Sequence, residues 1–297
     1  MQVPAPFEYE RASSVEHAIA LLTRHGPESR LVAGGHSLIP MMKLRLATPE
    51  TLVDINGVDE LTGIRVEGEY LRVGAMVRHA ELLDSAVVGE LFPILRDAER
   101  MIADPPVRNR GTVGGSLCQA DPSEDLSAAF TALRAVAVLQ GDAGRREVPV
   151  REFHRGPYVT VLDDAEILVE ILLPIRPGGG SAYDKVKRRV GDWAVASVGA
   201  ALWLSADPAG RGDTVTEVGI GLAALGAPHF DAPEAEEFLR GRPATEATFL
   251  EAGRIVAEHC RPPTDQRGPA DYKRHLACEL TVRALTRAAA RARGQEA

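Results

Sequence analysis

Cysteine is scarce in this sequence. The chain has three cysteines, Cys118, Cys260 and Cys278, which lie far apart and form no CxxC pair or cluster. A four-cysteine iron–sulfur site or a structural zinc site requires such a cluster. We therefore expect neither in this chain, and no metal-ligand set is predicted.

Long apolar runs are also absent. No stretch approaches the 18 uninterrupted apolar residues that mark a membrane-spanning helix. The first residues lack the charged segment and apolar run of a secretory signal. These observations predict a cytoplasmic protein without a transmembrane segment.

Basic residues are outnumbered by acidic ones. The chain has 34 Lys and Arg against 42 Asp and Glu, a net charge of −8. A nucleic-acid binder normally presents a basic face, so no nucleic-acid partner is expected. One stretch, Arg283 to Arg293, is rich in arginine. Because cations complement the negative end of a helix dipole, we interpret it as the end of a C-terminal helix.

Familiar catalytic motifs are missing as well. The sequence contains no phosphate-binding P-loop, no GxGxxG after a strand and no HExxH zinc motif. Ser37 and Ser116 follow glycines, but Ile39 and Cys118 stand where a serine-nucleophile motif needs its last glycine. No catalytic residue is predicted in this chain.

Two glycine-rich stretches stand out. The first is Val32 to Pro40, with a Gly-Gly pair followed two places later by Ser37, and the second is Gly111 to Ser116. Glycine lets the backbone turn sharply and approach a ligand closely, and successive free N–H groups form a concavity that binds phosphate. Each stretch alone is a weak signal. Together, two such turns are expected to grip one diphosphate from opposite sides.

The chain divides into three predicted domains. Residues 1–57 are expected to form a β-α-β-β unit whose helix is capped by Ser13 or Ser14, with a capping box from Ser13 to Glu16. Residues 58–177 are expected to hold a hairpin, several helices and two further strands. The Gly-rich stretch at residues 177–180 is predicted as a linker. Residues 178–297 are expected to form a three-stranded meander, with a turn at residues 207–210, followed by helices.

The two glycine stretches carry a family resemblance. Ala33 to Leu38 with Pro40, and Arg108 to Ser116, resemble the two FAD-binding signatures of the FAD-binding medium subunits of molybdenum hydroxylases. That family includes the medium subunits of aerobic carbon monoxide dehydrogenase and xanthine dehydrogenase. The resemblance extends over nearly the whole chain. It implies an α+β protein with a PCMH-type FAD-binding fold of two α/β subdomains plus a C-terminal domain with a three-stranded sheet and helices.

The resemblance also implies roles for individual residues. One side of the FAD diphosphate would be held by Ala33, Gly34, Gly35, His36, Ser37 and Leu38, and the other by Thr112, Gly114, Gly115 and Ser116. Asp125 would reach toward the ribityl or flavin region, Leu168 and Trp193 would lie at the isoalloxazine, and Lys185 would bring positive charge near it. Val in place of Gly35 or Gly114 is expected to lose FAD while the fold survives.

Several of the candidate residues also have a purely structural interpretation. Trp193 is equally explained as a core residue at the start of a strand, and Asp125 as a helix cap. The His36 imidazole is explained without a ligand, as a structural or solvent-facing group. His79 is interpreted as an ordinary residue at the start of a helix.

The function implied by the resemblance is electron transfer within a larger complex. A large partner subunit would carry the molybdenum cofactor, and a small one [2Fe–2S] clusters that pass electrons to the FAD of this chain. The acceptor would be a quinone, NAD or oxygen, and the assembly a dimer of heterotrimers. Two alternatives stay open at this point: a stand-alone flavoprotein oxidoreductase, and a flavin-free assembly scaffold.

Overall fold

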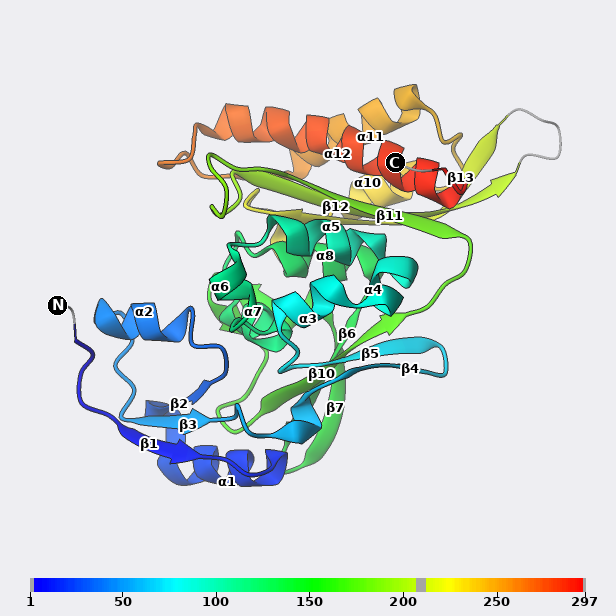
Figure 1. Cartoon of the computed structure of the whole chain (residues 1–297). Coiled ribbons are helices and arrows are strands. Elements are labelled where there is room, and N and C mark those ends of the chain that lie inside the picture. The colour runs from blue at the N-terminus through cyan, green and yellow to red at the C-terminus, as the bar shows by residue number, and fades with distance from the viewer. Residues whose placement is uncertain (1–2, 207–211, 296–297) are drawn as a thin grey trace.

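The computed structural model describes residues 3–206 and 212–295. Figure 1 shows three blocks stacked on one another, each built on a sheet of its own, with a small two-stranded sheet in addition. The larger sheets follow one another along the chain, in residues 8–54, 64–174 and 179–223. This arrangement is the predicted α+β fold, while the domain boundaries at residues 57 and 177 stay a prediction.

The N-terminal block is a small parallel sheet with a helix after each of its first two strands. Its strands pair in the order β1-β3-β2. In chain order the elements are β1 (Glu8–Arg11), α1 (Val15–His25), β2 (Ser29–Val32), α2 (Leu38–Lys43) and β3 (Thr51–Asp54). The predicted β-α-β-β unit therefore lacked α2. This helix is only six residues long and carries Pro40 in its first turn, where proline is tolerated.

Helix α1 begins one residue later than the predicted capping box requires. The Ser14 hydroxyl accepts the backbone N–H of His17 at 3.0 Å, and Ser14 is the N-cap. The Ser13 hydroxyl instead contacts the His17 ring at 3.0 Å. The capping box from Ser13 to Glu16 is therefore wrong, and the alternative cap, Ser14, is confirmed.

The middle block joins an antiparallel sheet to a group of helices. Its five strands pair in the order β4-β5-β10-β6-β7. They are β4 (Ile64–Glu67), β5 (Tyr70–Gly74), β6 (Val136–Gly141), β7 (Gly144–Pro149) and β10 (Ile167–Pro174), with β8 (His154–Gly156) and β9 (Val159–Thr160) as a separate pair. The helices are α3 (His79–Asp84), α4 (Ala86–Leu91), α5 (Pro93–Met101), α6 (Pro105–Arg108), α7 (Val113–Gln119), α8 (Asp125–Leu133) and α9 (Val150–Phe153). Strand β7 was not predicted from the sequence. Its first four residues are glycine or charged and all are exposed, so the apolar alternation of a strand is absent.

The C-terminal block is an antiparallel sheet covered on both faces. Its strands are β11 (Gly179–Val186), β12 (Ala196–Ala206) and β13 (Asp213–Ala223), followed by α10 (Pro233–Leu239), α11 (Glu246–His259) and α12 (Ala270–Ala292). Helices α10, α11 and α12 lie on one face, and α5 and α8 of the middle block on the other (Figure 1). The predicted turn at residues 207–210 lies outside the described residues. The three-stranded meander itself is confirmed.

The predicted linker ends earlier than expected. Gly179 and Gly180 belong to β11 and pair with Trp203 and Leu202 of β12. A Cβ built on Gly180 would overlap the backbone oxygen of Ala288 in α12. Glycine is needed here because the helix backbone lies directly on the strand, so the glycine run serves packing as well as chain flexibility.

The arginines of α12 join the C-terminal block to the middle block. Arg287 and Arg291 both bind the carboxylate of Asp97 in α5, with Arg291 Nη1 at 2.6 Å and Arg287 Nη2 at 3.1 Å from Oδ2. Arg293 pairs with Asp213 at the start of β13, at 2.6 Å. The stretch is therefore the end of a helix, as predicted, but tertiary ion pairs and not the helix dipole account for these side chains.

Replacing Asp97 by asparagine tests this junction. Breaking a buried ion pair costs about 3–5 kcal/mol and an exposed one below about 1 kcal/mol. Asp97 is 12% exposed and its partners are 31% and 18% exposed, so we expect Asp97→Asn to lower the free energy of unfolding by about 2 kcal/mol in urea titrations. Glu251→Gln, which breaks the exposed pair with Arg254, is the matched control. Equal effects of the two variants would contradict this account.

Candidate functional site

A cleft of about 770 Å³ lies where residues of all three blocks meet. Its wall is formed by the loop after β2, the start of α7 and α8, and the segment between β11 and β12. Every residue predicted for the site lines it: Ala33, Gly34, Gly35, His36, Ser37, Leu38, Thr112, Gly114, Gly115, Ser116, Asp125, Leu168, Lys185 and Trp193. A cavity of this size can enclose much of a cofactor-sized ligand.

The two glycine stretches touch at the cleft. A Cβ built on Gly34 would overlap the backbone oxygen of Arg110 and lie 2.7 Å from the Cα of Gly111. Real side chains do not approach backbone so closely, so only glycine fits at position 34. The prediction that these two distant segments meet at one cavity is confirmed.

The first stretch presents free donors to the cleft. The backbone N–H groups of residues 33–38 donate no hydrogen bond to any residue within 3–206 or 212–295. Gly35 holds a φ of +76°, a conformation that favours glycine. Helix α2 begins three residues later, at Leu38. The backbone N–H of Ile39 in its first turn donates to the Gly35 oxygen at 3.0 Å. Unpaired amides in such a turn are suited to anion oxygens.

The second stretch is a helix start and not the predicted turn. Thr112 caps α7 by accepting the Gly115 N–H at 3.1 Å. The N–H groups of Val113 and Gly114 donate to the backbone oxygens of Val77 and Ala75, both at 2.9 Å. These amides are already satisfied, so the two stretches are chemically unequal. What the second offers to a ligand is hydroxyl groups and a surface free of side chains.

Gly114 is required by packing. A Cβ at this position would lie 2.6 Å from the Cβ of Ala75 and 2.8 Å from its oxygen. Ala75 is 4% exposed and belongs to the core of the middle block. Because Val at position 114 would collide with this core, the structure argues against the expectation that Gly114→Val leaves the fold intact.

A polar network that sequence reasoning missed holds the two stretches together. Asn56 donates to the Ala33 oxygen at 2.8 Å and to Asp54 at 2.6 Å. Arg78 donates to Asn56 Oδ1 at 2.7 Å and also to the Arg110 oxygen. The network thus links the Ala33 oxygen of the first stretch to the Arg110 oxygen directly before the second stretch. Its only signal in the sequence is the Asn56-Gly57 pair, which by itself indicates a turn.

Asp125 and Lys185 are bound to each other. Lys185 Nζ lies 2.7 Å from Asp125 Oδ2, with both side chains almost fully buried, and Tyr183 donates its hydroxyl to Asp125 Oδ1. Lys185 lies at the cleft, as expected, but its positive charge is balanced by the adjacent Asp125 carboxylate. The cap of α8 is Glu124 and not Asp125, since Glu124 accepts the N–H groups of Leu126 and Ser127. Burial raises the pKa of Glu124 to about 7.

Trp193 and Leu168 give the cleft apolar surface. Trp193 is 44% exposed and lies on the segment between β11 and β12, while Leu168 on β10 is 4% exposed. The Trp193 N–H donates to Asp192 Oδ1 at 2.9 Å. Its exposure rules out the alternative interpretation as a core residue, and leaves an indole face beside the cleft.

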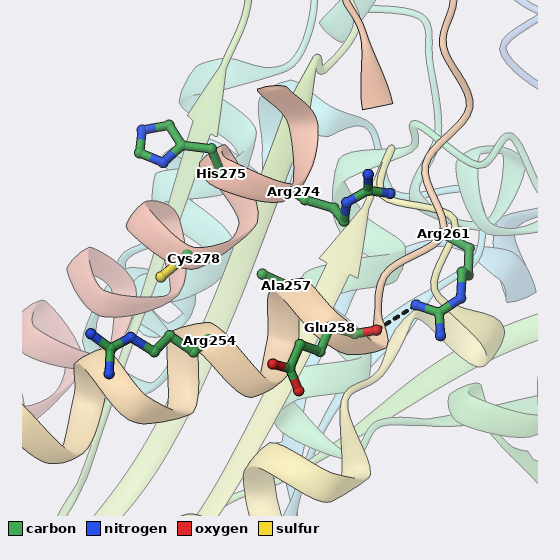
Figure 2. A pocket seen from close by; sticks show the side chains of 7 residues that line it. All are labelled: Arg254, Ala257, Glu258, Arg261, Arg274, His275 and Cys278. Carbon is green, nitrogen blue, oxygen red and sulfur yellow. Dashed lines mark hydrogen bonds between the residues drawn. The ribbon is translucent and has the colours of Figure 1, made fainter. Parts of the chain in front are cut away.

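A second hollow lies between α11 and α12. Figure 2 shows Arg254, Glu258, Arg261 and Arg274 around it, with Arg261 turned back onto the Glu258 backbone oxygen. None of the predicted site residues lines this hollow. The cleft at the glycine stretches is therefore the candidate functional site.

No helix within residues 3–206 and 212–295 has the length and apolarity to cross a bilayer.

Two family models cover most of the chain. Residues 5–176 match the FAD binding domain in molybdopterin dehydrogenase, and residues 181–288 match the CO dehydrogenase flavoprotein C-terminal domain. Among curated relatives, the carbon monoxide dehydrogenase medium chain of Hydrogenophaga pseudoflava is 41% identical, covering 97% of this chain and 99% of the relative. The glyceraldehyde dehydrogenase medium chain of Sulfolobus acidocaldarius is 33% identical, covering 95% and 98%.

Solved structures show the same relationship. Carbon monoxide dehydrogenase from Hydrogenophaga pseudoflava matches with a TM-score of 0.93 and 43% identity, covering 97% of this chain and 99% of that chain. Quinoline 2-oxidoreductase from Pseudomonas putida matches with a TM-score of 0.89 and 33% identity, covering 98% and 99%. The cleft, its two glycine stretches and these similarities agree: the chain belongs to the FAD-binding medium subunits of molybdenum hydroxylases, the oxidoreductase family that includes the carbon monoxide dehydrogenase medium chains.

Proposed function

We propose that this chain holds one FAD in the cleft and carries electrons from [2Fe–2S] clusters of a partner subunit to an external acceptor such as a quinone, NAD or oxygen. Bound FAD supplies one- and two-electron chemistry, while the protein sets its position and electrostatics. The residues of this chain then have three tasks: holding the diphosphate, orienting the flavin ring and excluding water from it.

The free amides of residues 33–38 are the observation that carries the proposal. They line the cleft without an acceptor among the described residues, and such donors suit phosphate oxygens. We assign one side of the diphosphate to Ala33–Leu38. The other side falls to the hydroxyl groups of Thr112 and Ser116, with Gly114 and Gly115 as the surface that allows close approach.

The flavin ring is assigned to the apolar part of the cleft. Leu168 and Trp193 offer a flat, water-excluding surface there, and an indole provides stacking area. The Asp125–Lys185 pair supplies a fixed ion pair of zero net charge that can hydrogen-bond to the ribityl or flavin region. In this assignment the chain orients the cofactor and needs no acid–base catalyst of its own.

The partners are inferred from the names of relatives. Several are called medium chains or subunits, in complexes named for carbon monoxide, glyceraldehyde and nicotine. We propose a large subunit with the molybdenum cofactor and a small subunit with [2Fe–2S] clusters, assembled as a dimer of heterotrimers. Since relatives of 33–41% identity serve different substrates, the substrate is assigned to the large subunit and not to this chain.

The first test is cofactor content. The purified full chain, supplied with FAD, is expected to bind close to one FAD per chain, with flavin absorbance shifted from that of free FAD because the ring leaves water. Absorbance after gel filtration measures this stoichiometry. A chain that is folded by circular dichroism yet takes up no FAD would favour the assembly scaffold instead.

A single glycine tests the role of the first stretch. In Gly35→Ala the added Cβ meets only the movable Ile39 side chain, but the φ of +76° becomes strained, by about 1 kcal/mol. Relief of that strain turns the amides, so FAD affinity should fall by roughly tenfold, about one good hydrogen bond. Gly241→Ala, with a φ of +73° and open space around it, is the matched control and should leave the affinity unchanged. Isothermal titration compares the two, and equal affinities would refute the amide assignment.

Tryptophan emission tests the position of the ring. The chain has two tryptophans, Trp193 at the cleft and Trp203 on β12, which packs under Arg176 at 5.2 Å. FAD should quench tryptophan emission, because flavin accepts excitation energy from a nearby indole. Most of this quenching is expected to vanish in Trp193→Phe and to persist in Trp203→Phe. The reverse pattern would move the ring away from Trp193.

A further inference from the structure

Three polar side chains from three different helices form a chain of hydrogen bonds at the cleft. His79 at the start of α3 lies with Nδ1 2.9 Å from Glu99 Oε1 of α5 and with Nε2 3.0 Å from Ser116 Oγ of α7. His79 is 3% exposed and Glu99 is fully buried. His79 and Ser116 both line the cleft. His79, expected to be an ordinary residue at the start of a helix, is the centre of this relay.

The protonation state of His79 decides which way the Ser116 hydroxyl points. A cationic imidazole donates from both nitrogens, to Glu99 through Nδ1 and to Ser116 Oγ through Nε2. The Ser116 proton is then free to donate into the cleft. In a neutral imidazole that donates to Glu99 through Nδ1, Nε2 carries no proton and is an acceptor. The Ser116 hydroxyl then donates its hydrogen bond to Nε2. The hydroxyl then turns only lone pairs toward the cleft.

The charges around His79 favour the cation. Glu99 faces it directly from α5, and the carboxylates of Glu124 and Asp125 in α8 act on it from farther away. Glu99 raises the pKa of His79 against the opposing effect of burial. Burial likewise raises the pKa of Glu99, with the Arg108 guanidinium of α6 acting in the other direction. The second oxygen of Glu99 has no hydrogen-bond partner among the described residues, so His79 is the group that holds this carboxylate.

We propose that the Ser116–His79–Glu99 relay is a proton-dependent element of the cofactor site, in which the His79 cation orients the Ser116 hydroxyl to donate to a phosphate oxygen of FAD. Glu99 and His79 are positioning residues in this proposal, and Ser116 is the group that touches the ligand. The proposal rests on the assignment of FAD to the cleft. It adds a requirement that the assignment alone lacks, namely that a proton on His79 supports binding of the dianionic diphosphate.

The proposal predicts a pH dependence of a definite sign. FAD binding is strongest while His79 is protonated and weakens as the pH rises through the pKa of His79, which is raised above its usual value. Binding also takes up a proton in that range. Glu124, whose pKa is about 7, lines the same cleft, and its ionisation would weaken anion binding in the same direction. The experiment must therefore separate the relay from Glu124.

The experiment is an FAD titration of the deflavinated full chain between pH 6 and pH 9.5, followed by flavin fluorescence. Ser116→Ala should bind roughly tenfold more weakly at low pH and lose most of the pH dependence, because a hydrogen bond to a charged group contributes about this factor. Glu99→Gln should shift the midpoint to lower pH, since burial without the carboxylate disfavours the imidazole cation. Glu124→Gln should shift the midpoint less than Glu99→Gln does, because Glu124 acts on His79 only from farther away.

The matched control for the hydroxyl is Ser13→Ala. Ser13 also bonds a histidine, His17, at 3.0 Å, but on the exposed surface and away from the cleft, so this variant should follow the wild-type profile. A pH-independent affinity of the wild-type chain, or profiles unchanged in Ser116→Ala and Glu99→Gln, would overturn the relay. Loss of the pH dependence in Glu124→Gln alone would overturn it too. A wild-type chain that binds no FAD at any pH would refute the proposed function itself.

Discussion

The site depends on a backbone contact that excludes side chains. Gly34 lies against Arg110 and Gly111 so closely that a Cβ has no space, and this contact joins the N-terminal sheet to the helices of the middle block. Arg78 and Asn56 reinforce it by binding the backbone oxygens of Arg110 and Ala33, respectively. With the two stretches fixed against each other, the residues 33–38, which line the cleft with unpaired amides, are held in a set geometry. Preorganised donors of this kind bind an anion without first rearranging.

The two glycine stretches have different physical roles although their sequences look alike. In the first, the backbone donors are free and the glycine at position 35 holds a left-handed conformation. In the second, the donors are used within the protein and Gly114 fits against Ala75. One stretch therefore has unpaired donors at the cleft, while the other forms a close-packed wall. A similar pattern of glycines and hydroxyls does not by itself say which of these roles a segment has.

Much of the fold could be predicted from the sequence where local signals are strong. The helices expected after the C-terminal meander are present, and α11 (Glu246–His259) shows why: it has Thr245 as its cap and buries Phe249, Ala252 and Val256 at helical spacing. Helix α2 was missed, since six residues with a central proline give little periodicity. The cleft followed from the family resemblance more than from periodicity. Arg78, Glu99 and the Asp125–Lys185 pair were missed or misjudged because their partners come from distant segments, and single-chain patterns carry no such distances.

The cleft wall draws residues from all three blocks, so whatever fills the cleft also fastens them together. A ligand that binds only the folded chain adds RT ln(1 + [L]/Kd) to its stability. The N-terminal block packs on the middle sheet through a shared apolar core that includes Ile19, Leu22 and Leu172, and a ligand in the cleft would add to that contact. With FAD as that ligand, cofactor supply during synthesis would help to determine how long the folded chain resists proteolysis. A shortage of flavin in the cell would then lower the amount of this chain, because the unliganded chain would be degraded and would not accumulate in an inactive form.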